Sequence, residues 1–163
     1  MDNTEQIVFK NPKGESFTHQ EVAKELFAYM NSDRDSYYKI TIGTDSLLYS
    51  NLAADFVTAI VIHRVGSGGR YFYRRVLLEK FHTIRDRMLR EVMISLDMGK
   101  MMVKELKKYK GKEFGLEIHV DIGEKGETKN MIQELTGMIR ANNFEPIIKP
   151  YSYAATSVAD KHT

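Results

Sequence analysis

Two carboxylates lie near the carboxyl ends of segments that are typical of β-strands. Residues 39–42, Lys-Ile-Thr-Ile, alternate polar and apolar side chains as a half-buried strand does, and Gly-Thr-Asp-Ser, which contains Asp45, follows at once. In residues 116–121 the apolar side chains again share one face, and Asp121 ends the other face. Burying a charge is costly, and open α/β sheets bind ligands outside the carboxyl ends of their strands. The two acids therefore meet at one edge if their strands are neighbours.

Two further acids have positions that need an explanation. Glu91 lies three residues after Met88 and four before Ser95, so it borders the apolar stripe of an amphipathic helix, where an unpaired charge is rare. Asp160 lies in the closing segment Thr-Ser-Val-Ala-Asp-Lys-His-Thr, just past the last predicted strand. Both acids are candidates for the same site.

A cluster of these carboxylates predicts divalent-metal chemistry. Two like charges about 4 Å apart repel by ~4 kcal/mol at an effective dielectric of about 20, so the cluster persists only if protons or cations neutralise it. The chain has no cysteine, and hard oxygen ligands without sulfur favour Mg²⁺ or Mn²⁺ over zinc. Two such ions roughly 3.5–4 Å apart can activate a water and stabilise the leaving oxygen of a phosphodiester.

Each acid also has a purely structural interpretation. Asp45 and Asp121 could each begin a turn, where aspartate is common, and Glu91 could be a solvated residue at the edge of its helix. Ser157 and Asp160 have the spacing of a capping box, so Asp160 could belong to the start of a terminal helix. Either strand-end acid alone favours a turn, whereas the two together in this topology favour the site.

Composition limits the class of protein. The chain has 163 residues, 42% of them hydrophobic and 28% charged, which is ordinary for one soluble globular domain. A net charge of +2 permits a nucleic-acid partner without requiring one. The first residues have no basic or apolar region of a signal peptide, and the longest apolar stretch, residues 56–62, is too short to span a bilayer. We expect a cytoplasmic protein without a membrane partner.

Hydrophobic periodicity predicts the elements that carry the acids. Thr18 and Glu21 have capping-box spacing and begin a leading helix that ends near Asp33. The five predicted strands cover residues 38–45, 55–65, 70–81, 114–123 and 144–152, and two later helices cover residues 84–109 and 126–143. This order predicts an α/β fold, in which a mixed five-stranded sheet of three antiparallel strands followed by βαβ crossovers carries helices on its faces. The leading helix is an extra N-terminal element.

The strand and helix order, with the segments "IGTDS", "HVDIG" and "SVADKHT", resembles the ribonuclease H-like superfamily, and within it the YkuK-type family of predicted ribonuclease H-related proteins. The resemblance runs from about Lys39 to Thr163. It implies one ribonuclease H-like domain over residues 1–163, with a core at about 38–163 and an N-terminal helical extension at about 1–35. It also implies that four acids bind two divalent metal ions and are catalytic: Asp45, Glu91, Asp121 and Asp160.

The implied function is hydrolysis of nucleic-acid phosphodiester bonds by a Mg²⁺- or Mn²⁺-dependent nuclease. The alternative is a non-catalytic nucleic-acid-binding or assembly module that keeps the same fold. An actin-like ATPase would need a duplicated domain, for which the chain is too short. RNA, DNA and hybrid substrates all stay open, because the sequence contains no recognisable base-reading motif, and no feature indicates an oligomeric state.

Several other residues have two interpretations each. His119 shares a strand face with Asp121 and is predicted to be a packed or hydrogen-bonded histidine rather than a ligand. His162 could shuttle a proton or contact a phosphate, although a histidine in a tail usually faces solvent. Residues 71–75 alternate aromatic and basic side chains, which in a strand usually indicates core packing. Arg85 and Arg87 are either surface charges or contacts for a phosphate backbone.

Overall fold

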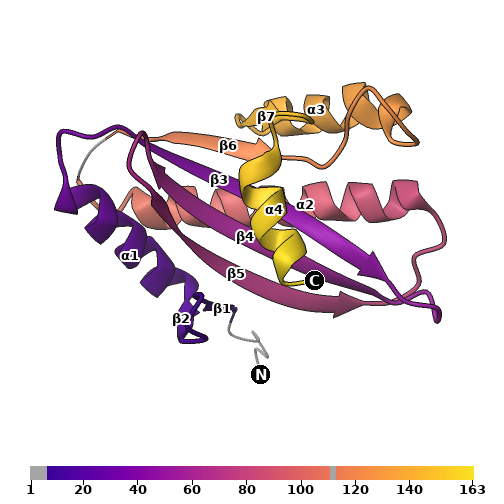
Figure 1. Ribbon diagram of the computed structural model, residues 1–163, viewed down its shortest axis with the longest axis horizontal. Coiled ribbons are helices and arrows are strands. Elements are labelled where there is room, and N and C mark those ends of the chain that lie inside the picture. The colour runs from indigo at the N-terminus through magenta and orange to yellow at the C-terminus, as the bar shows by residue number, and fades with distance from the viewer. Residues whose placement is uncertain (1–6, 111–112) are drawn as a thin grey trace.

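The apolar segments in the middle of the chain form one mixed sheet. A computed structural model describes residues 7–110 and 113–163, and its sheet has seven strands in the order β2-β1-β5-β4-β3-β6-β7 (Figure 1). The strands are β1 (Val8–Lys10), β2 (Ser16–Thr18), β3 (Tyr38–Leu48), β4 (Ala54–Arg64), β5 (Gly69–Leu78), β6 (Gly115–His119) and β7 (Glu145–Ile147). The helices are α1 (His19–Ser32), α2 (Ile84–Leu106), the 3₁₀ turn η1 (Lys129–Met131), α3 (Ile132–Ala141) and α4 (Tyr153–Lys161).

The predicted fold class is confirmed. β3, β4 and β5 pair antiparallel, and β6 and β7 extend the sheet in parallel from β3, as the predicted order requires. The strand count is the difference, because the hairpin β1–β2 adds two strands beside β5. Each of these strands has three residues, too few for an alternating pattern. The Asn11 side chain shapes their turn by accepting hydrogen bonds from the backbone N–H groups of Lys13 and Glu15.

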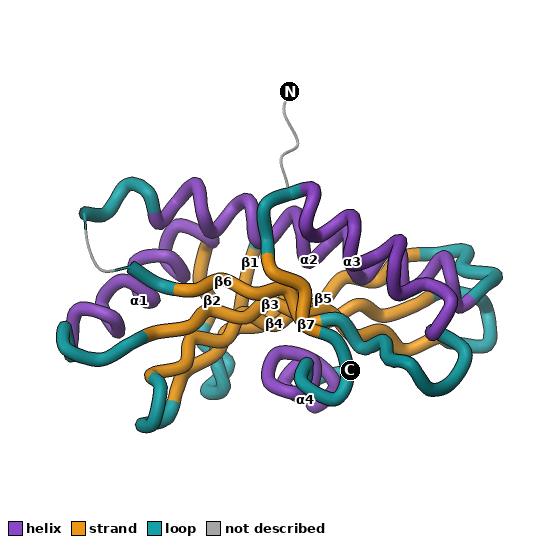
Figure 2. The backbone as a smooth tube through the Cα atoms, turned by 90° about the horizontal axis from the view of Figure 1, so that it is seen from above, coloured by secondary structure: helices purple, strands orange, loops and turns teal. Residues whose placement is uncertain are grey.

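The helices cover both faces of the sheet unequally. α1, α2 and α3 lie on one face, and α4 lies on the other (Figure 2). The face toward α2 carries fully buried isoleucines from β3 and β4, which pack with Val92, Leu96 and Met102 of that helix. Among the described residues, no helix combines the length and the apolar character that crossing a membrane requires.

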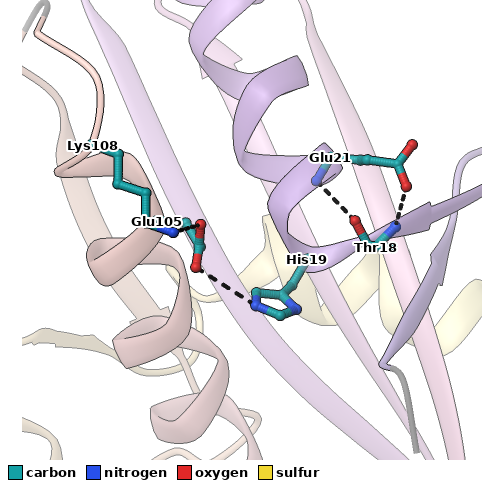
Figure 3. Close-up of polar contacts among 5 residues, drawn as sticks. All are labelled: Thr18, His19, Glu21, Glu105 and Lys108. Atoms are coloured by element: carbon teal, nitrogen blue, oxygen red, sulfur yellow. Dashed lines mark hydrogen bonds and ion pairs between the residues drawn. The ribbon is translucent and has the colours of Figure 1, made fainter.

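The N-terminal extension is tied to helix α2. The predicted capping box is confirmed: Thr18 Oγ1 accepts a hydrogen bond from the Glu21 N–H at 3.1 Å, and Glu21 accepts one from the Thr18 N–H at 3.2 Å. His19, the first residue of α1, lies 3.6 Å from the Glu105 carboxylate, which also pairs with Lys108 at 2.8 Å (Figure 3). The pKa of Glu105 is lowered, chiefly by the hydrogen bond from Lys108. The cap therefore begins α1 at the point where it meets α2.

Strand β3 extends past its parallel neighbour. The β3–β6 ladder ends at the pair Gly43–His119, whereas the β3–β4 ladder continues to the pair Leu48–Ala54. The sequence predicted that this strand ends at Asp45. Pairing with β4 keeps Ser46, Leu47 and Leu48 extended as well. The last five residues of β3 thus have a partner on one edge only.

We expect Thr18→Ala to lower the free energy of unfolding by about 1 kcal/mol, because the first turn of α1 loses its side-chain acceptor. Urea denaturation followed by circular dichroism measures the change. Thr18→Ser keeps the hydroxyl and is the matched control. An alanine variant as stable as the serine variant would show that the capping box does not stabilise the fold.

Candidate functional site

Asp45 lies in the extended part of β3 that β6 does not cover. It pairs with Val57 of β4 inside the antiparallel ladder, so the interpretation that it begins a turn is wrong. Its neighbour Ser46 points toward α2, where it bonds Glu91. Because side chains alternate along a strand, Asp45 points to the opposite face, where α4 lies (Figure 2).

Asp160 reaches the same place from helix α4. The carboxyl groups of Asp45 and Asp160 lie within hydrogen-bonding reach of each other. Burial, this contact and the charge of Asp160 together raise the pKa of Asp45 from 3.8 to about 6. The capping interpretation of Asp160 is wrong, because Ser152 precedes the first turn of α4 and Ser157 lies within the helix.

Glu91 approaches from the α2 face. Its side chain is on the buried side of the helix and only 4% exposed, so the interpretation as a solvated edge residue is wrong. Ser46 Oγ donates a hydrogen bond to Glu91 Oε2 at 3.0 Å, and Arg87 lies 3.3 Å from the same hydroxyl oxygen. Burial and then the charge of Asp45 raise the pKa of Glu91 well above its ordinary value. A buried carboxylate next to other acids is costly unless it is neutralised.

Asp121 lies at the open end of β6. The strand ends at His119, four residues before the predicted end at Gly123, and Asp121 lies in a bend beyond it. Two backbone hydrogen bonds hold this bend against the segment after β7, from the Val120 N–H to Ile147 O at 2.9 Å and from the Lys149 N–H to Ile122 O at 2.8 Å. Asp121 helps to raise the pKa of Asp45 and of Glu91, so its charge is near both.

The four predicted acids therefore approach the uncovered end of β3 from different sides. Asp160 comes from one face of the sheet, Glu91 from the other, and Asp121 from the edge. The prediction that Asp45 and Asp121 belong to neighbouring parallel strands is confirmed, with Asp121 just past its strand. Among residues 7–110 and 113–163, no three histidine or carboxylate side chains lie close enough together to hold a metal ion.

Lys149 is a residue of this region that the sequence analysis missed. Its Nζ lies 2.9 Å from Asp121 Oδ1, at a position where both side chains are about half exposed. The available signal was its place at the end of the last predicted strand, which reaches the same sheet edge as the acids. A lysine there is a natural partner for a carboxylate.

Asp55 is a second residue that the analysis missed. It is almost fully buried, and its carboxylate lies 3.1 Å from Arg75 Nε. It pairs with Leu47, two positions along the ladder from the pair of Asp45, so the two aspartates share a sheet face. From the sequence alone, an aspartate at the start of a strand cannot be distinguished from an aspartate in the preceding turn.

The two histidines differ in outcome. His119 is buried and contacts Glu117 at 3.2 Å, which confirms the prediction of a packed, hydrogen-bonded histidine. Burial lowers its pKa, although Glu117 opposes this effect. His162 is not a solvent-facing tail residue, because its ring stacks on Tyr73 with 3.8 Å between the centroids. Of the arginines, Arg85 pairs with Glu134 at 2.5 Å rather than facing the acids.

Comparison with known proteins identifies the family of the chain. The family described as ribonuclease H-like matches residues 21–163. The chain belongs to this family. The family match covers all four acids and every strand from β3 to β7.

A relative supports the narrower family as well. The chain is 34% identical over 168 aligned positions to the uncharacterized protein YkuK of Bacillus subtilis (strain 168), and the alignment covers 96% of this chain and 97% of that protein. The resemblance to the YkuK-type family is thus confirmed. No solved structure gives a significant match.

We expect the metal-free protein to lose stability as the pH rises through about 6, the folded-state pKa of Asp45. The unfolded chain releases this proton near pH 3.8, so the contribution of protonated Asp45 is fully present below that value and is lost through the higher one. Glu91 acts in the same direction, because its pKa is also raised. Melting temperatures in chelator across this range measure the effect.

Asp45→Asn should flatten that pH dependence, because the variant has no proton to lose at this position. Asp97→Asn is the matched control, since Asp97 is an exposed acid of α2, and it should keep the wild-type slope. Equal slopes for wild type and Asp45→Asn would contradict the raised pKa.

Proposed function

We propose that this protein is a divalent-metal-dependent nuclease that hydrolyses nucleic-acid phosphodiester bonds. The observation that carries the proposal is the approach of four carboxyl groups to the end of β3 that β6 leaves uncovered, with Asp160 within hydrogen-bonding reach of Asp45. Acids from two helices, a strand and a loop do not gather by charge alone, since like charges repel. Membership of the ribonuclease H-like family supports the same chemistry.

The residues present fit Mg²⁺ or Mn²⁺. The donors are carboxylates and a serine hydroxyl, which are hard oxygen ligands. The carboxyl groups of Asp45 and Asp160 lie within reach of each other, and a cation between them would neutralise both. We propose that binding draws Glu91 and Asp121 toward this pair, so that all four acids become ligands.

Each side chain then has a definite task. Divalent ions held by the four acids would polarise the scissile phosphate and lower the pKa of the attacking water. Ser46 fixes the Glu91 carboxylate by its 3.0 Å hydrogen bond. Arg87, which lies within 3.4 Å of both Ser46 oxygens, places positive charge next to the acids, where a phosphate would lie. RNA, DNA and hybrid strands all carry the phosphodiester that this chemistry requires.

A second candidate is a nucleic-acid-binding or assembly module that retains the fold without catalysis. It is favoured by one observation: among the described residues no three acids or histidines are already close enough to hold a metal ion. The two candidates differ in whether cleavage depends on the acids and on added metal.

We expect labelled RNA, DNA or hybrid to be cleaved with Mn²⁺ and not in chelator. Asp45→Asn and Asp121→Asn should remove cleavage almost entirely without unfolding the protein. Glu91→Gln should be severe as well, and Asp160→Asn should lower turnover by orders of magnitude because the partner of Asp45 is lost. Gel-based cleavage rates and urea midpoints on the same preparations separate activity from folding.

Asp97→Asn controls for the charge change, since its exposed acid lies on the same helix as Glu91. It should cleave as wild type does. Cleavage that survives in Asp45→Asn would come from another nuclease and would contradict the proposal, as would complete absence of cleavage of all three nucleic acids.

We also expect Mn²⁺ or Mg²⁺ to stabilise the native protein by ~2.7 kcal/mol at a hundredfold excess over Kd, because the unfolded chain lacks the site. Asp45→Asn should abolish most of this gain, while its metal-free form is no less stable than wild type because a repulsive charge is gone. Asp97→Asn should keep the gain. Thermal unfolding indifferent to both ions, against a chelated baseline, would count against the metal site.

A further inference from the structure

A cavity of about 550 Å³ is lined by Lys149, whose Nζ also pairs with Asp121. It is bounded by two segments, the loop from Gly123 to Lys125 and the link from Ile148 to Tyr151 that leads into α4. The hydrogen bond from the Lys149 N–H to Ile122 O holds these segments together at 2.8 Å. Its volume is in the range of ligand-binding pockets.

The polar lining of the cavity is mainly cationic. Lys125 and Lys149 both line it, against one acid, Glu124. Lys149 lies at the boundary with the acid cluster, because its Nζ is 2.9 Å from Asp121 Oδ1. Gly123 lets the lysine stem lie close, since a Cβ at Gly123 would be 3.0 Å from Lys149 Cβ. An anionic group in the cavity would thus lie between two lysines, one of which, Lys149, also pairs with Asp121.

An exposed aromatic ring completes the cavity. Tyr151 lines it and is 75% exposed, the largest exposure among the large hydrophobic side chains of the described residues. Its backbone is fixed by a hydrogen bond from the Tyr151 N–H to Ile148 O at 2.9 Å, so the ring projects from an ordered turn. A ring in this position offers a face on which another planar group can stack.

We propose that this cavity binds single-stranded nucleic acid beside the scissile bond, with a phosphate at Lys125 and Lys149 and an adjacent base stacked on Tyr151. A positive groove with an aromatic platform is the usual chemistry of single-strand binding. A duplex fits less well, because its bases are stacked on each other and cannot lie flat on the ring. This inference rests on the proposed nuclease function. It adds that the nucleic acid cleaved at the acids is single-stranded.

Binding can be measured apart from cleavage. Fluorescence anisotropy with labelled oligothymidylate, oligouridylate and a matched duplex is performed in chelator, so that no hydrolysis occurs. Tyr151→Leu should weaken strand binding roughly tenfold, whereas Tyr151→Phe keeps the ring and should bind as wild type. Lys125→Met should lower the slope of log affinity against log salt by about 0.7, the value for one phosphate contact on a single strand.

Two controls and a second lysine variant make the test specific. Tyr37→Leu and Lys24→Met change an exposed tyrosine and an exposed lysine elsewhere in the fold, and neither should alter binding. Lys149→Met should also reduce the salt slope. Lys125→Met is the deciding variant, because Lys125 has no ion pair with Asp121 to lose.

The outcomes separate this inference from the proposed function. Strand binding unchanged in Tyr151→Leu and Lys125→Met would overturn the inference, even if the protein cleaves nucleic acid. Duplex bound as tightly as the single strands, with the same losses in both variants, would overturn it too. If Tyr151→Leu and Lys125→Met weaken binding of single strands but not of duplex in chelator, the inference is supported, whether or not the protein proves to be a nuclease.

Discussion

The difference in length between β3 and β6 is the constraint on which the candidate site depends. Had β6 paired with β3 over its full length, the last five residues of β3 would be covered on both edges. Because the parallel ladder ends at Gly43, no strand covers the β6 side of β3 at Asp45. This position can be approached from that edge and from both faces of the sheet. A helix on each face and a loop at the edge can therefore all bring a carboxylate to one place.

The acids then need neutralisation, and several weak sources supply it in the metal-free protein. Asp45 holds a proton more tightly than an ordinary aspartate, because its pKa is raised to about 6, and the Ser46 hydroxyl bonds to Glu91. Lys149 pairs with Asp121 at 2.9 Å. Each source can be replaced: the proton leaves as the pH rises, and the half-exposed lysine pairs only weakly in solvent. An added cation would therefore compete mainly with protons, which favours its binding above the raised pKa of Asp45.

Sequence reasoning went furthest where the pattern was local. Alternating apolar residues identified all five core strands, and the spacing of Thr18 and Glu21 identified α1. The hairpin β1–β2 was missed, because three-residue strands carry no periodicity. The topology predicted that the acids lie near one another, but it did not predict the sheet face on which each one lies. A shift of one residue along a strand moves a side chain from the α2 face to the α4 face. The carboxylates' roles as ligands and catalysts stay proposals.

The sequence offered a terminal helix only as one beginning near Asp160, whereas α4 begins at Tyr153, and contacts with residues far along the chain hold it on the sheet. Ala159 is fully buried and packs against Val57 and Ala59 of β4, so small side chains on both elements let the helix approach the sheet closely. At its end, the His162 ring stacks on Tyr73, and Arg75 donates a hydrogen bond to the His162 carbonyl. None of these contacts involves a member of the acid cluster. The helix is thus positioned independently of the charge state of Asp160, and can hold that carboxyl group against Asp45 whether a proton or a cation lies between them.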